Sequence, residues 1–372
     1  MRRFIRYLTD YLRNSSRPAL LLTTLLVAAL IYANYSVGIE RRIQALPWYG
    51  AIGAFFAFFS LVLALVWGLQ YEWGYKERAA TTTPTLRRGH IEVTTSVAPL
   101  GYFQPKMLLL LALAALFFSL KMVHWDLGPL LPNTLHFPWD RYTLLVIQLP
   151  LKLLLLFTFL FACRKFGLLE GNSIAAGTGL TRRNFDAAPY FALLLLLIPL
   201  IALASTQHDF LQVYPKVQNL SFIDGFAHPA WPWKLLYELS YGLDFLGIEL
   251  FFRGLLVIGL LRFVGQDARA SSDLLRTSPD LLRHGPSRSG PSLGPRPHRS
   301  GPSLDSVLPM AAFYCTIHFG KPLGECISSF FGGLILGVLA ANNRTILGGL
   351  IVHLGLAWLM EIGGWLGHLY FH

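Results

Sequence analysis

Long uninterrupted runs of apolar residues constrain this chain more than any other feature of its sequence. Of its 372 residues, 54% are hydrophobic and 14% are charged. Runs of about 18 residues or more are long enough to cross the hydrocarbon core of a bilayer as helices. The sequence therefore predicts an all-α, polytopic membrane helix bundle of about nine transmembrane helices, at residues 18–37, 47–69, 106–123, 143–163, 188–205, 233–263, 306–320, 324–341 and 345–369.

The basic residues predict the orientation of these spans. Most of the 31 Lys and Arg residues lie in alternate connections, at residues 1–17, 71–106, 164–187 and 262–305. Short loops rich in Lys and Arg stay in the cytoplasm. We therefore expect a cytoplasmic N-terminus and an outer C-terminus in a multi-pass protein of the bacterial plasma membrane. Topology and contact with anionic membrane lipids account for the net charge of +11. No nucleic-acid motif is present, so nucleic acid is not an expected partner.

The chain divides into two membrane regions and one linker. Residues 1–142 are expected to form an N-terminal membrane region with three spans, and residues 143–372 a second membrane domain. The stretch 265–304 interrupts this domain and is rich in Gly, Pro and Ser. A segment of this composition cannot bury enough apolar surface to order itself. It is predicted to be a disordered cytoplasmic linker, and a tolerated insertion is favoured over a lid or docking tail.

Charged and polar residues inside the predicted spans indicate a functional site. Glu249 and Arg253 lie one helical turn apart in an apolar segment, and His318 and His353 lie in two later spans. A charge at the centre of a membrane helix costs roughly 3 kcal/mol and usually faces the bundle interior. Counted from the cytoplasmic end of each span, Glu249, His318 and His353 lie at depths of ~20, ~18 and ~12 Å. We expect these groups to share one layer of the bundle.

Such a layer has the residue types needed for peptide-bond hydrolysis. A carboxylate beside a buried histidine can hold a water molecule, take its proton and direct it at a carbonyl carbon. A second histidine or an arginine can stabilise the oxyanion. Glu249, Arg253, His318 and His353 are therefore candidate catalytic residues. The alternative is structural: an internal Glu249–Arg253 ion pair that ties helices together, beside histidines that are simply hydrogen-bonded in the core.

Three stretches resemble the motifs of a known family. They are Ile248-Glu249-Leu250-Phe251-Phe252-Arg253-Gly254, Tyr314-Cys315-Thr316-Ile317-His318 and His353-Leu354-Gly355-Leu356-Ala357. Their order and spacing are similar to E-E-x-x-x-R, F-x-x-x-H and H-x-x-x-N of the CAAX protease and bacteriocin-processing (Abi) family of intramembrane endopeptidases. The resemblance, strongest to CAAX prenyl proteases of the second type, covers roughly residues 160–369. It implies an enzyme that cuts a peptide or lipidated protein at the cytoplasmic side.

Two positions depart from the family pattern. Ile248 replaces the first glutamate, which in the family is thought to activate the attacking water, and Ala357 replaces the closing asparagine-type residue. We therefore expect Glu249 itself to act as the base. Asp244, which lies one turn from Ile248 on the same helix face, is expected to assist it as a fifth candidate catalytic residue.

The sequence leaves the cofactor and the activity open. No cofactor is required, because a carboxylate can activate water without a metal. Zinc is the alternative, with Glu249, His318 and His353 as the His-His-carboxylate set of catalytic zinc sites. The alternative to an enzyme is a catalytically impaired relative that serves as a membrane scaffold or as a bacteriocin-immunity and self-protection protein. A transporter is a third class, for which the sequence shows no inverted repeat.

Overall fold

The structure is a computed structural model that describes residues 2–75, 104–183, 185–264 and 304–371. The expected linker lies outside the described residues, apart from its last residue, Leu304. The described part of the chain is helical and contains no strand. Its elements are α1 (Arg2–Asn14), α2 (Arg17–Val37), α3 (Ile39–Gln44), α4 (Trp48–Gln70), η1 (Tyr71–Tyr75), α6 (Pro105–Met122), η3 (Gly128–Leu130), α7 (Trp139–Lys165), α8 (Ile174–Thr178), α9 (Ala188–Ala204), α10 (His208–Leu211), η4 (Lys216–Gly225), α11 (Trp231–Glu249), η5 (Leu250–Gly259), α12 (Leu261–Val264), α14 (Val307–Thr316), α15 (Leu323–Asn343) and α16 (Leu347–Phe371).

Six helices among the described residues are long and apolar enough to cross a membrane, namely α2, α4, α6, α7, α15 and α16. Helices α9 and α14 are apolar but shorter. The span expected at 233–263 is divided among α11, η5 and α12. Many large apolar side chains point outward, for example Leu195 and Trp358 at 67% and 59% exposed. The described part of the chain is thus an all-α bundle with the apolar exterior of an integral membrane protein.

Prolines recur in the first turn of the helices. Pro18, Pro105, Pro189 and Pro232 occupy the first or second position of α2, α6, α9 and α11. The backbone N–H groups of the first turn have no partner within a helix, so proline loses no hydrogen bond there, and its fixed φ suits the helical conformation. These residues set where each chain segment enters its helix.

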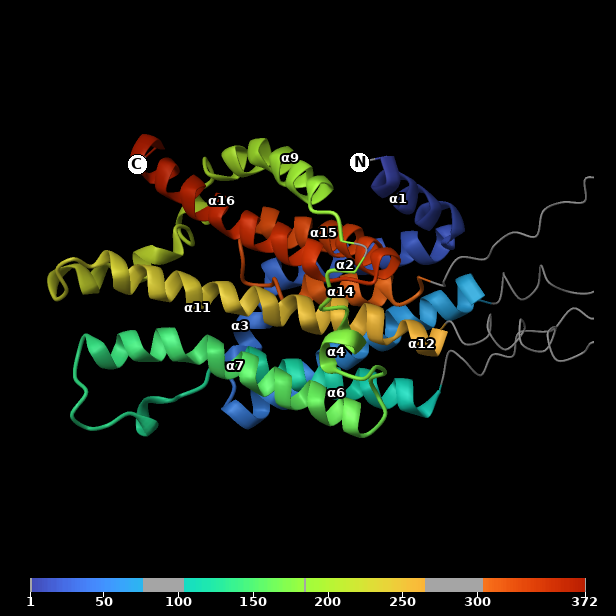
Figure 1. Ribbon diagram of the computed structural model, residues 1–372, viewed down its shortest axis with the longest axis horizontal. Helices are drawn as coiled ribbons and strands as arrows, with labels where there is room; N and C mark the ends of the chain where they lie inside the picture. Colours follow the sequence, from blue (N-terminus) through green and yellow to red (C-terminus); the bar gives the residue numbers. More distant parts are fainter. Residues whose placement is uncertain (1, 76–103, 184, 265–303, 372) are drawn as a thin grey trace, which may run out of the picture.

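The bundle packs together helices that are neighbours along the chain and helices that are distant along it. Helix α7 lies along α11 and α14 packs on α15, while α9 lies at the periphery against α16 (Figure 1). The N-terminus and the C-terminus lie towards opposite ends of the long axis (Figure 1). Segment η5 lies between α8, α11, α14 and α15, and all ten of its residues are buried. This segment is the centre of the bundle.

An aromatic cluster holds η5 against the helices beside it. Phe252 packs on Phe118 of α6 and on Phe313 of α14, with ring centroids 5.1 and 5.3 Å apart. Phe313 in turn lies 4.8 Å from Phe59 of α4. Offset or edge-on aromatic pairs contribute about 0.5–1.5 kcal/mol each beyond the area they bury. The cluster fixes η5 next to α14, and so fixes where Arg253 lies.

Candidate functional site

Glu249 lies at a change of helix type in the bundle centre. It is the last residue of α11, and the chain continues directly into η5, a π-helical segment. Short π-helical segments inside helices often occur at functional sites. Arg253 lies one turn further along, with its Nη1 3.1 Å from Glu249 Oε1. Both side chains are 0% exposed, so neither charge is compensated by water.

His353 of α16 completes the contacts of the Glu249 carboxylate. Its Nδ1 lies 2.5 Å from Glu249 Oε1, the same oxygen that Arg253 approaches. Neither contact has the linear N–H···O geometry of a hydrogen bond, since these atoms have no hydrogen-bond partner among the described residues. Both are polar contacts at short distance. One carboxylate oxygen therefore faces a guanidinium and an imidazole at once.

Tyr314 of α14 joins this group from the other side of the imidazole. Its hydroxyl lies 2.8 Å from His353 Nε2. Arg253 Cζ lies 4.4 Å from the centre of the Tyr314 ring, over its face, which is a cation–π arrangement. Glu249, Arg253, Tyr314 and His353, here called the buried tetrad, bring together residues from α11, η5, α14 and α16.

His318 lies beside the buried tetrad rather than within it. It follows the end of α14, and its Nδ1 is 2.9 Å from the backbone carbonyl oxygen of Tyr314. Its ring packs edge-on against the Tyr314 ring, with centroids 4.6 Å apart. His318 is half-buried. The structure thus connects His318 with Glu249 through Tyr314 and His353.

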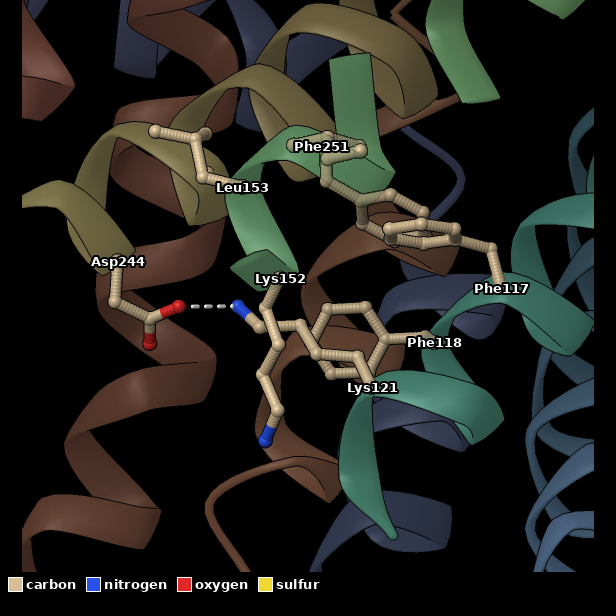
Figure 2. Close-up of a pocket in the computed structure, with 9 residues that line it drawn as sticks. Phe117, Phe118, Lys121, Lys152, Leu153, Asp244 and Phe251 are labelled. Carbon is tan, nitrogen blue, oxygen red and sulfur yellow. Dashed lines mark ion pairs between the residues drawn. The ribbon is translucent and has the colours of Figure 1, made fainter. Parts of the chain in front are cut away.

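Asp244 faces another helix. Its Oδ1 lies 2.7 Å from Nζ of Lys121 of α6, at a small cavity lined by aromatic rings and by Lys152 (Figure 2). Asp244 and Glu249 are five residues apart, which places them about 140° apart around the helix at 100° per residue. The structure therefore brings Glu249, Arg253 and His353 together and holds Asp244 against Lys121, away from them.

The donors expected for zinc do not converge. Among the described residues, no group of three or more His, Cys, Asp or Glu side chains lies close enough together to hold a metal ion. The Tyr314 ring lies against both imidazoles, with its centroid 4.6 Å from that of His318 and 5.8 Å from that of His353. The zinc set of Glu249, His318 and His353 does not fit this geometry, and no step is derived through a metal.

Sequence reasoning missed two residues of the site. Tyr314 lies one turn before His318, at a position where the family pattern has phenylalanine. The hydroxyl that tyrosine adds there was the signal that could have identified this residue. Gly349 lies one turn before His353 on the same face of α16. A Cβ at Gly349 would lie 2.1 Å from Glu249 Oε2, so only glycine lets α16 approach the carboxylate this closely.

Comparison of the chain with protein-family models, with curated proteins and with solved structures finds no match. The function is therefore inferred from the site itself.

Replacing Gly349 tests the close approach of α16 to Glu249. In Gly349→Ala the new methyl group overlaps Glu249 Oε2, so the carboxylate or the helix must move, and overpacking of this kind costs about 1–3 kcal/mol. Gly332→Ala is the matched control, because nothing lies within 4 Å of a Cβ there. Unfolding in mixed detergent micelles should show a loss of stability for Gly349→Ala only. Equal stability of the two variants would contradict the close approach.

Proposed function

We propose that this chain is an integral-membrane endopeptidase in which Glu249 activates the attacking water. The observation that carries the proposal is the convergence on Glu249 Oε1, which lies 2.5 Å from His353 Nδ1 and 3.1 Å from Arg253 Nη1. These residues come from two separate motifs. Their convergence supports a common role, since ionisable groups inside a membrane bundle usually mark a functional site.

Glu249, Arg253 and His353 each have a role in this chemistry. The contacts with Arg253 and His353 are made by Glu249 Oε1, so Oε2 is the oxygen available to accept a proton from water. The water oxygen bonds to the scissile carbonyl carbon, the C–N bond breaks, and the proton held by Glu249 passes to the leaving nitrogen. Arg253 and His353 stabilise negative charge on the carboxylate, and Arg253 also stabilises that on the oxyanion. The substrate is a peptide or a lipidated protein segment that lies in or at the membrane.

Burial of the site imposes a conformational step on this reaction. Glu249 and Arg253 are 0% exposed, so water and substrate reach them only when the helices around them part. Opening and closing of this kind sets the rate of many enzymes. We expect helix α16 to move in this opening step, because it carries His353 and packs on Glu249 through Gly349.

A non-catalytic membrane protein is the second candidate, favoured by the same burial. In this account the buried tetrad only ties α11, α14 and α16 together. The apolar side chains of Ile248 and Ala357, 9% and 5% exposed, replace the polar residues that the family pattern has at these positions. A scaffold or an immunity-type protein would require nothing more from the site.

A cleavage assay with matched variants separates the two candidates. Purified protein in detergent is incubated with prenylated and unprenylated peptide libraries, with added zinc or with a chelator, and products are identified by mass spectrometry. Glu249→Gln should lower cleavage by about 100-fold or more, since it removes the base. Asp244→Asn, the same change of carboxylate to amide on the same helix, should keep activity because Asp244 contacts Lys121.

Full activity of Glu249→Gln would refute its role as the base. Absence of cleavage by the unaltered protein under every condition would favour the non-catalytic candidate.

We further propose that the protein crosses the bacterial plasma membrane about nine times with its N-terminus in the cytoplasm. Each expected span falls on a helix, with α9, α14 and the α11–η5–α12 segment added to the six long helices. The basic residues of α1, such as Arg2 and Arg13, and those at the end of α7, Arg164 and Lys165, would then lie on the inner side. This arrangement agrees with the positive-inside rule.

Cysteine labelling in intact cells tests the orientation. Gln218→Cys in η4 should react with a membrane-impermeant maleimide from outside, whereas Asn172→Cys, between α7 and α8, should react only after permeabilisation. Both positions are exposed, and the three native cysteines are buried. The opposite labelling pattern would show that the orientation is the reverse of the proposed one.

A further inference from the structure

We propose that Tyr314 is a positioning residue, whose hydroxyl donates a hydrogen bond to His353 Nε2 and thereby holds the imidazole proton on Nδ1, the ring nitrogen next to Glu249 Oε1. The catalytic consequence of this role rests on the proposed endopeptidase activity. The hydrogen-bond arrangement itself does not, because it is a property of the resting protein.

Charge balance defines the protonation of the buried tetrad. The Glu249 carboxylate and the Arg253 guanidinium sum to zero net charge at a place where both are 0% exposed. A protonated His353 would add an uncompensated positive charge, and a deprotonated Tyr314 an uncompensated negative one. An unpaired charge in a low-dielectric interior costs several kcal/mol or more. The balanced state therefore has a neutral imidazole and an intact phenol.

The position of Glu249 then selects the tautomer. His353 Nδ1 lies 2.5 Å from Glu249 Oε1. A lone pair on Nδ1 would lie beside this negative oxygen and be repelled, whereas the positive hydrogen of an N–H group is attracted to the oxygen even off the N–H axis. The proton consequently lies on Nδ1, and Nε2 is left as an acceptor. Tyr314, 2.8 Å from Nε2, must therefore be the donor.

The surroundings hold the Tyr314 ring beside the imidazole. The residue is 5% exposed. Arg253 covers one face of the ring, Phe252 lies 5.0 Å away edge-on, and His318 lies 4.6 Å away. The ring is thus fixed from several sides, and the hydroxyl is directed at the imidazole.

Phenylalanine at this position would leave His353 without its donor. Nε2 would then be a buried acceptor with no partner, and the imidazole would be free to place its proton on Nε2 and its lone pair towards Glu249. That change would push the carboxylate and the imidazole apart. Tyr314 therefore selects one of the two tautomers of neutral His353, as the residue that orients the histidine does in other histidine-dependent hydrolases.

Nitrogen NMR of the resting protein tests this assignment. The full chain is labelled with ¹⁵N-histidine in lipid nanodiscs, and the signals of His353 are identified among those of the eleven histidines by comparison with His353→Gln. We expect a protonated Nδ1 and an unprotonated, hydrogen-bonded Nε2. In Tyr314→Phe the Nε2 signal should shift to that of a free acceptor, or the tautomers should become mixed.

Tyr142→Phe is the matched control. Tyr142 is a buried tyrosine, 4% exposed, whose hydroxyl donates to the Trp233 carbonyl at 2.8 Å, and it belongs to a separate cluster. This variant should leave the His353 signals unchanged. Identical His353 signals in Tyr314→Phe and the unaltered protein, or a doubly protonated His353 in the unaltered protein, would overturn the proposal.

The activity assay separates this proposal from the proposed function. If the protein cleaves peptides, Tyr314→Phe should lower kcat by about 10-fold to 100-fold, with KM nearly unchanged and activity shifted along the pH axis. If it cleaves none, the NMR result still decides whether Tyr314 sets the tautomer. A fall in kcat without a change in the His353 signals would assign Tyr314 another role and refute this one.

Discussion

The burial of the Glu249 carboxylate is the constraint on which the rest of this structure depends. A carboxylate with 0% exposure at the centre of a membrane bundle has no water to solvate it, so its negative charge must be balanced by protein groups. Arg253 supplies the opposite charge from the next turn. His353 supplies an imidazole from another helix, and the Tyr314 hydroxyl is the hydrogen-bond partner of the imidazole Nε2. Each partner requires the next, and together they connect the continuous α11–η5 segment with α14 and α16, which are distant from it along the chain.

The surrounding fold places these groups at the required distances. The aromatic cluster around Phe252 and Phe313 fixes η5 against α14. The π-helical segment begins directly after Glu249, and Gly349 lets α16 approach the carboxylate without a side chain between them. The same contacts close the site to solvent. An enzyme built on this arrangement must open in order to work, while a scaffold need not.

The sequence was sufficient to predict the main features of the fold and part of the site. Long apolar runs define helices because the backbone can satisfy its hydrogen bonds inside a bilayer in few other ways. Each expected span coincides with helical residues, although the one at 233–263 is divided among α11, η5 and α12. Charged residues in such runs are rare, so Glu249, Arg253 and His353 could be predicted to lie together. Six of the helices are long and apolar enough to cross a membrane, whereas α9 and α14 are shorter than the apolar runs from which they were predicted.

Side-chain direction could not be predicted in the same way. Spacing along one helix placed Asp244 near Ile248, but it is Lys121 on α6 that determines where the Asp244 carboxylate points. Likewise, equal depth in the membrane did not show that Tyr314 would link His318 to His353. Tyrosine and glycine are ordinary in apolar helices, so Tyr314 and Gly349 gave little signal before the helices were seen to meet.

A double-mutant cycle between Glu249 and His353 tests the central contact most directly. Unfolding free energies are measured in mixed micelles for the unaltered protein, Glu249→Gln, His353→Gln and the double variant. Residues in direct contact show coupling of about 0.5–3 kcal/mol, and a carboxylate oxygen 2.5 Å from an imidazole nitrogen should fall in the upper half of that range. A coupling energy indistinguishable from zero would contradict the contact and the site built on it.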